Sequence, residues 1–161
     1  MQEKEIRVVY SEYASDGELP AADKALLETA RKTTATAYAP YSHFRVGAAA
    51  RLANGVTVTG TNQENASYPA GICAERTLLS VAASLHPGVA IDTLAISYDN
   101  EQGESDRPIA PCGICRQSLQ EFEQRTGQSM RIILAGQSGK VIVLERSGIL
   151  LPFAFSADEL K

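Results

Sequence analysis

Three cysteines and one glutamate are the residues of this chain whose types and spacing could support catalysis. Cys112 and Cys115 form a Cys-x-x-Cys pair directly after a proline, and Cys73 precedes them in the chain. A structural zinc site uses four protein ligands, whereas a catalytic zinc site uses three and leaves one position open for water. Three thiolates without a fourth cysteine or an evident histidine partner therefore favour a catalytic zinc ion.

Glu75, two positions after Cys73, is the candidate for proton transfer. Zinc lowers the pKa of bound water to about 7, and a carboxylate beside it can take and return the proton. Residues two apart lie on different faces of a helix, so spacing alone does not place this carboxylate at the metal. Arg76, three positions after Cys73 and on its face, is the candidate for offsetting the negative charge of a three-thiolate zinc site; a surface salt bridge is the alternative for Arg76.

Two other interpretations of the cysteines stay open on the residues alone. Cysteine is often buried as a small hydrophobic residue, and a lone Cys-x-x-Cys also occurs in redox motifs. A redox role for Cys112 and Cys115 would leave Cys73 and Glu75 without a function. The chain shows neither a nucleophile-elbow motif nor a glycine-rich phosphate loop.

Hydrophobic periodicity predicts the elements that must position these residues. The chain alternates between the two kinds of element, which indicates a layered α/β domain with a mixed sheet covered by helices. The cysteines lie at the starts of the second and third helices, whose positive ends can face a common site. Predicted helices cover residues 20–38, 72–85 and 112–125; predicted strands cover residues 44–52, 56–61, 94–98, 131–135 and 141–144, with an Asn-Gly turn after the first.

We expect a single domain over residues 1–161, in which residues 1–20 form an extension with a possible edge strand at 6–10. Fifteen basic and nineteen acidic residues give a net charge of -4, which offers no footprint for nucleic acid. No apolar run approaches the roughly 18 residues that span a bilayer. The charged N-terminus lacks the apolar stretch of a signal peptide, so we expect a cytoplasmic protein with neither nucleic-acid nor membrane partners.

Cys73-Ala74-Glu75 followed by Pro111-Cys112-Gly113-Ile114-Cys115 resembles the zinc signature of nucleoside deaminases. Residues 38–49, 61–69 and 150–155 are similar to further blocks of the small homotetrameric cytidine deaminases, in the same order. The resemblance covers roughly residues 21 to 160. It implies a three-layer α/β/α sandwich with a mixed five-stranded sheet, and a homotetramer with shared active sites.

The resemblance also implies a reaction and a role for each matching position. The reaction is zinc-dependent hydrolysis of free cytidine and 2'-deoxycytidine to uridine and 2'-deoxyuridine, with release of ammonia, in pyrimidine salvage. One zinc ion is bound by Cys73, Cys112 and Cys115, and Glu75 moves the proton from water to N3 of cytosine and then to the leaving ammonia. The resemblance implies that Asn62 and Glu64 contact the ribose hydroxyls. It implies that Phe44 and the Ala74 backbone contact the face or edge of the base, and that Phe155 reaches into the site of a neighbouring subunit.

The chain departs from the family pattern at three positions. Thr61 stands where a cysteine is frequent, Ala110 stands where a serine is frequent, and Phe153 replaces a small residue. Deamination of a modified cytosine compound, such as a nucleoside antibiotic, remains an alternative, as does a zinc-bound scaffold or binding module without turnover. Asn62 and Glu64 favour an ordinary ribose, and Glu75 favours turnover.

Overall fold

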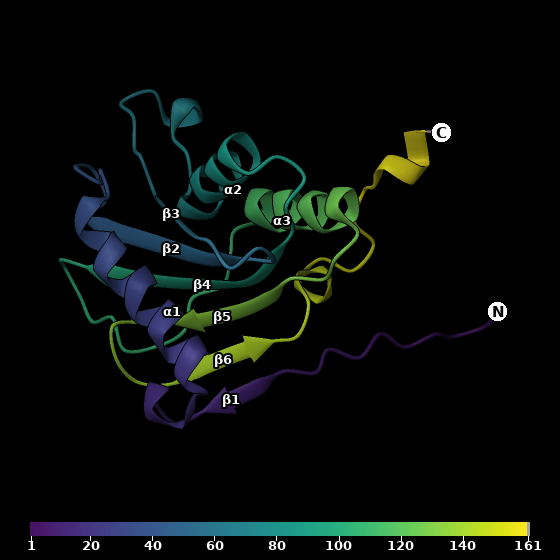
Figure 1. Cartoon of the computed structure of the whole chain (residues 1–161), viewed down its shortest axis with the longest axis horizontal. Helices are drawn as coiled ribbons and strands as arrows, with labels where there is room; N and C mark the ends of the chain where they lie inside the picture. The colour runs from purple at the N-terminus through teal and green to yellow at the C-terminus, as the bar shows by residue number, and fades with distance from the viewer. Residues whose placement is uncertain (161) are drawn as a thin grey trace.

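A six-stranded mixed sheet forms the centre of the computed structural model, which describes residues 1–160 (Figure 1). The strand order is β1-β6-β5-β4-β2-β3. Within the described residues β4 and β5 run parallel, and the other neighbouring strands run antiparallel. The strands are β1 (Ser11–Tyr13), β2 (Phe44–Leu52), β3 (Thr57–Thr61), β4 (Ile91–Asn100), β5 (Arg131–Ala135) and β6 (Val141–Leu144).

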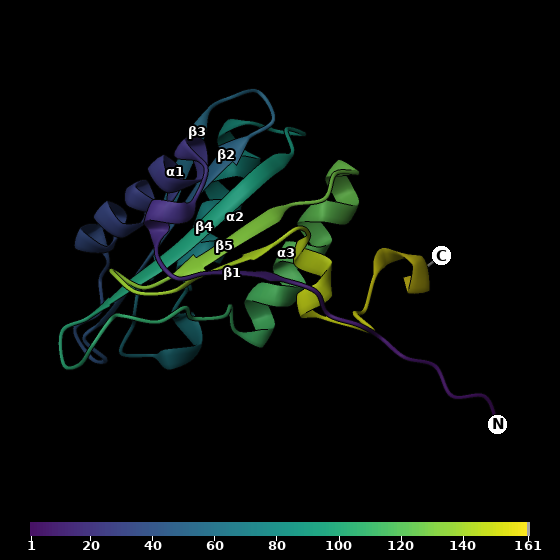
Figure 2. The ribbon, with the colours of Figure 1, turned by 90° about the horizontal axis from the view of Figure 1, so that it is seen from below.

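Helices cover both faces of this sheet, which confirms the three-layer α/β/α arrangement (Figure 2). One face carries α1 (Ala21–Thr33), and the other carries α2 (Ala74–Leu85) and α3 (Gly113–Thr126) side by side. Two hydrophobic clusters fill the two interfaces, one centred on α1 and the other on α2 and α3. None of the helices within residues 1–160 is long and apolar enough to cross a membrane.

Two glycines let the helices approach the sheet closely. A Cβ atom at Gly47 in β2 would lie 2.2 Å from the Ala30 carbonyl oxygen of α1. A Cβ atom at Gly60 in β3 would lie 2.4 Å from the Leu78 nitrogen and 2.6 Å from the Ala74 carbonyl oxygen of α2. Real Cβ contacts are longer than this, so the missing side chain at Gly60 determines how near the first turns of α2 come to the sheet.

The predicted edge strand at residues 6–10 is wrong in position. The edge strand forms at Ser11–Tyr13 and adds a sixth strand to the five that were expected. Its partner β6 has only four residues, and Val141 to Val143 are the ones that face β1. Residues 6–9 lie beyond the end of β6, and no strand within residues 1–160 pairs with residues 6–10.

The first predicted helix ends earlier than expected. The α-helix stops at Thr33, and a 3₁₀ turn at Thr34–Thr36 follows it. The hydroxyl groups of Thr33, Thr34 and Thr36 each donate to a carbonyl oxygen three or four residues back. Such bonds compete with regular helix geometry, so the run of threonines ends the helix before Pro40 is reached.

Candidate active site

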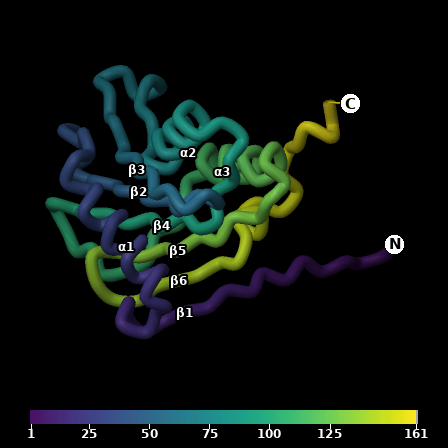
Figure 3. Tube along the Cα trace, viewed as in Figure 1, coloured from purple at the N-terminus to yellow at the C-terminus, as the bar shows by residue number. Residues whose placement is uncertain are grey.

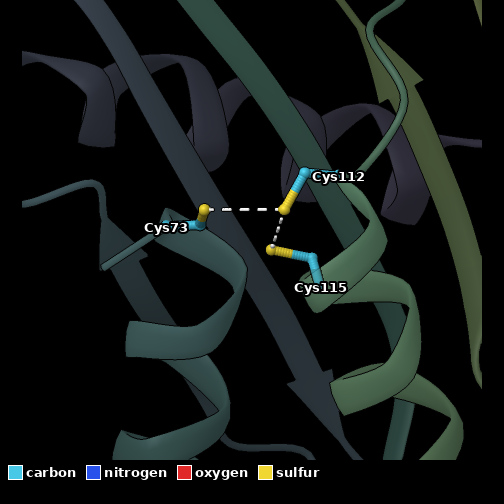
Figure 4. A group of neighbouring side chains, drawn as sticks. All are labelled: Cys73, Cys112 and Cys115. Atoms are coloured by element: carbon cyan, nitrogen blue, oxygen red, sulfur yellow. Dashed lines mark hydrogen bonds between the residues drawn. The ribbon is translucent and has the colours of Figure 1, made fainter. Parts of the chain in front are cut away.

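The three cysteines meet where α2 and α3 begin (Figure 4). Cys73 is the N-cap of α2, Cys112 is the N-cap of α3, and Cys115 lies in the first turn of α3. The Sγ atoms of Cys73 and Cys112 are 3.8 Å apart, those of Cys112 and Cys115 are 3.4 Å apart, and all three lie within 4.8 Å of one another. Tetrahedral zinc with Zn–S bonds of 2.3 Å requires sulfur atoms about 3.8 Å apart. This three-thiol cluster therefore fits one zinc ion.

The surroundings of the cluster favour the thiolate form that metal binding needs. Both N-cap cysteines sit at helix ends whose free N–H groups carry partial positive charge. A hydrogen bond from Cys115 lowers the pKa of Cys73 to about 6, and the nearby charge of Arg76 adds to the lowering. The same interaction with Cys73, together with burial, raises the pKa of Cys115. The negative charge of the cluster is therefore most favourable on Cys73.

Glu75 lies against this cluster and is almost fully buried, with 5% of its surface exposed. Burial raises the pKa of its carboxyl group, and hydrogen bonds from its own backbone and from Cys115 oppose that rise in part. The contact with Cys115 comes from α3, the neighbouring helix, which is why the spacing from Cys73 could not predict it. A buried carboxyl group with a raised pKa beside three thiols that could hold a metal ion is suited to accept and return a proton.

Arg76 is a half-buried residue of α2. It lines a groove together with Ser80, Glu121 and Arg125. Within residues 1–160 it forms no ion pair, so the surface salt bridge considered for it is not observed. Its charge does act on Cys73, in the direction that the charge-offset hypothesis requires.

A pocket of about 260 Å³ opens beside Cys73, and both predicted ribose-binding residues line it. The Glu64 carboxylate accepts backbone N–H groups from Tyr41 at 2.9 Å and Ser42 at 3.2 Å. Burial works against its ionisation, but hydrogen bonds from the Ser42 side chain and from these two N–H groups outweigh it and lower the pKa of Glu64. The pocket therefore holds a fixed negative acceptor. Besides Cys73 and Glu64, it is lined by Tyr41, Asn62, Gln63, Asn65, Tyr68, Gly71 and Ile72.

The side-chain amide of Asn62 is bonded to the backbone of β2. Its Oδ1 atom accepts from the Val46 N–H group at 2.8 Å, and its Nδ2 atom donates to the Phe44 carbonyl at 2.9 Å. The amide thus takes the place of a strand neighbour just beyond the end of β3. Because a primary amide carries two N–H donors, one donor at Nδ2 is left for a ligand.

Phe44 stacks on a residue that the sequence did not bring to attention. Its ring lies 4.9 Å from that of Tyr98 in β4, with 14° between the ring planes. Val46 is the residue directly opposite Tyr98, so the Phe44 contact is diagonal across the strand pair. Only the strand register, which the sequence does not display, could have identified Tyr98.

Ala74 and Phe155 lie in contrasting places. Ala74 is fully buried as the first residue of α2, so its N–H group is among those that no helix carbonyl accepts. Phe155 is 59% exposed, its carbonyl accepts a hydrogen bond from the Gln117 side chain of α3, and it is not among the residues that line the pocket.

Arg116 is a further residue that the sequence reasoning missed. Its Nε atom donates to the Pro111 carbonyl at 2.9 Å, and its Nη1 atom donates to the Leu150 carbonyl at 3.1 Å. These bonds join the loop before Cys112 to the segment that follows β6. An arginine directly after a Cys-x-x-Cys pair was the signal that could have indicated such a brace.

Comparison with known proteins gives one consistent result. The family model described as the cytidine and deoxycytidylate deaminase zinc-binding region matches residues 20–129, so residues 1–19 lie outside it. The chain is 37% identical over 135 residues to a cytidine deaminase of Halalkalibacterium halodurans, covering 84% of this chain and 95% of the relative. It is 39% identical over 131 residues to a cytidine deaminase of Mycobacterium tuberculosis, covering 81% and 87%.

Solved structures agree with this result. The crystal structure of cytidine deaminase from Burkholderia pseudomallei matches with a TM-score of 0.70 and 40% identity, covering 81% of this chain and 97% of that one. A structure of the cytidine deaminase from Mycobacterium tuberculosis matches with a TM-score of 0.64 and 31% identity, covering 84% and 98%. With the three-thiol cluster in place at the helix starts, the chain therefore belongs to the cytidine and deoxycytidylate deaminases, a family of zinc-binding enzymes.

Proposed function

We propose that this chain hydrolyses free cytidine and 2'-deoxycytidine to uridine and 2'-deoxyuridine, with release of ammonia, in pyrimidine salvage. The observation that carries the proposal is the buried Glu75 carboxyl group beside the three-thiol cluster, next to a pocket that Asn62 and Glu64 line. Relatives that are 37 to 39% identical and carry the name cytidine deaminase support it. The negative net charge favours a free nucleoside over a polynucleotide, which would need basic grooves.

The reaction exchanges the C4–N4 bond of cytosine for a C4–O bond from water. Cys73, Cys112 and Cys115 hold the zinc ion, which when bound supplies a Lewis acid that makes water nucleophilic near neutral pH. Glu75 accepts a proton from the attacking water at its carboxylate and delivers it to N3 of cytosine. It then moves a second proton to the amino group, which leaves as ammonia. The raised pKa of Glu75 suits this role, because a group that both takes and gives a proton works best with a pKa near the working pH.

The pocket beside Cys73 binds the sugar. Glu64 accepts and the spare Nδ2 donor of Asn62 donates hydrogen bonds to ribose hydroxyls, and the Ala74 backbone holds the edge of the base. Phe44, backed by Tyr98, packs beside the base. Polar groups that are organised for a hydroxyl discriminate strongly against a ligand that lacks it, because they would be left unpaired.

The active assembly in this proposal is a homotetramer, and the whole chain is one deaminase domain with an N-terminal extension. Phe155 contributes to the site of a neighbouring subunit. The exposure of the C-terminal segment supports this contact with a neighbouring subunit, because Phe153 is 95% exposed and Phe155 is 59% exposed. Clustered, highly exposed aromatic side chains are typical of surfaces that contact another chain. Arg76 offsets the charge of the three thiolates.

Glu75→Gln tests the proton-transfer role. The variant should keep one zinc per chain and the wild-type unfolding temperature, yet lose at least about 10²-fold in turnover of cytidine, because general acid–base catalysis contributes that much or more. Turnover is followed by the loss of cytidine absorbance, and zinc by metal analysis. Glu28→Gln, an exposed glutamate on α1, is the matched control and should change neither. Near-normal turnover in the Glu75 variant would exclude the proposed proton transfer.

Glu64→Ala tests the ribose assignment. It should raise the KM for cytidine while zinc content stays at one per chain, since Glu64 lines the pocket and is not part of the three-thiol cluster. A loss of zinc with unchanged KM would show that the residue supports the metal site instead. Zinc-loaded wild-type protein that does not convert cytidine would redirect the search to modified cytosine compounds or to a binding role.

A further inference from the structure

The N-terminal arm, residues 1–10, projects away from the body of the molecule past the end of β6 (Figures 1 and 3). Its apolar side chains are exposed: Ile6 by 54%, Val8 by 48%, Val9 by 65% and Tyr10 by 54%. Within residues 1–160 no hydrogen bond or ion pair involves residues 1–9. The arm also lies outside the part of the chain that matches the deaminase family. A partner for the arm therefore has to be sought outside its own chain.

The composition of the arm is that of a β-strand. Residues 6–10 contain one isoleucine, two valines and a tyrosine, which are among the residues most enriched in strands. The arm runs directly into β1, which is an edge strand paired on one side with β6. An extended, apolar segment at an open edge is a template for pairing with another strand.

We propose that the arm pairs with the arm of a second copy of this chain, antiparallel and about a two-fold axis at Val8. In this register Val8 lies opposite the partner's Val8, Ile6 opposite the partner's Tyr10, and Lys4 opposite the partner's Glu12. The two paired arms cover the apolar residues on one face of each other, and an ion pair lies at each end of the paired segment. The Glu12 carboxylate already accepts from Lys140 in its own chain at 2.6 Å, so it lies between two ammonium groups in the pair.

Charge selects this register over its neighbours. A shift by one residue in either direction places Glu12 opposite another glutamate, either Glu3 or Glu5 of the partner. Like charges directly opposite each other destabilise a strand pair. A shift by two residues places Glu12 opposite the partner's Ile6, or Arg7 opposite the partner's Arg7. Among these registers only the one centred on Val8 joins opposite charges and pairs apolar residues with each other.

Cysteine substitution tests the register centred on Val8 directly. In zinc-loaded protein under mild oxidation, Val8→Cys should form a disulfide between two chains, because directly opposite residues of an antiparallel pair have Cα atoms about 4.5–5.5 Å apart, within the range that a disulfide spans. Val9→Cys is the matched control: it is the same residue type, one position along, and its symmetric copies are diagonal at about 7–8 Å, too far for a disulfide. The linked peptide is identified by mass spectrometry, with the unsubstituted chain as background. Equal linkage through both positions, or none through position 8, would overturn the proposal.

Charge exchange then tests the pairing of Lys4 with the partner's Glu12. In the Val8→Cys background, Lys4→Glu should slow the linkage by roughly tenfold, since each pair of arms loses two ion pairs and gains two repulsions. Adding Glu12→Lys together with Lys140→Glu, which keeps an ion pair between positions 12 and 140 of the same chain, should restore the rate. Failure of this rescue would overturn the register. Turnover of cytidine should be unchanged in all these variants, so the arm proposal and the proposed function fail independently.

Discussion

Replacing Gly60 with alanine should disturb the metal site from a position that touches none of its ligands. The new Cβ atom would lie 2.4 Å from the Leu78 nitrogen and 2.6 Å from the Ala74 carbonyl oxygen, both in the backbone of α2. Ordinary contact begins at 3.4 Å, so the first turns of α2 must move by about 1 Å. Ala74 lies between Cys73 and Glu75, and the movement therefore shifts both relative to α3.

Two effects of different size follow from that displacement. Overpacking of a buried contact costs about 1–3 kcal/mol of folding free energy. Displacement of reacting groups by about 1 Å can reduce turnover by about 10²-fold. We therefore expect a folded Gly60→Ala protein that unfolds earlier in urea and has lost much more activity than stability, with weaker zinc retention against a chelator.

Thr59→Ala is the matched control for Gly60→Ala. Thr59 is the preceding residue of β3 and is exposed on the opposite face, so its truncation changes the same strand without touching α2. It should retain zinc and turn over cytidine at close to the wild-type rate. A Gly60→Ala protein with wild-type turnover and zinc retention would refute the argument that contact at Gly60 sets the position of α2.

Three further outcomes are expected. Arg116→Met should lower the free energy of unfolding by about 2 kcal/mol in urea titrations, because charged donors to the Pro111 and Leu150 carbonyls are lost; a change below about 0.5 kcal/mol would show that the brace is unimportant. Because the pKa of Glu64 in the folded chain is below its ordinary value of 4.5, the stability difference between wild type and Glu64→Gln should be constant above about pH 4.5 and shrink as the pH falls through the folded pKa. A stability difference that grows on acidification would contradict the lowered pKa of Glu64 in the folded chain. Chelation of zinc should make the Cys73 and Cys112 thiols reactive while the buried Cys115 stays protected, and it should lower the unfolding temperature, since a zinc ion would join the starts of α2 and α3; unchanged reactivity of Cys73 and Cys112 would argue against ligation by the cysteines.

Features that depend on near neighbours in the chain were predictable from the sequence. The starts of α2 and α3 at the cysteines, the turn at Asn54 and Gly55 and the buried face of α3 all follow from periodicity and turn chemistry. The likeness of the zinc signature follows from residue types and spacing alone. The helix ends and the edge strand were less accurate, because β6 provides partners for only three residues of β1 and threonine hydroxyls end α1.

The arrangement of side chains around the site could not be obtained from those patterns. Glu75 reaches the three-thiol cluster because α3 packs beside α2, and the position of α2 in turn depends on Gly60 in β3. Asn62 is held by the backbone of β2, and Phe44 is backed by Tyr98 of β4. Each of these contacts joins segments that are distant in the chain, and each depends on strand register and helix packing. Residue order specifies which groups are available for chemistry, whereas their distances and pKa values arise only when the layers pack together.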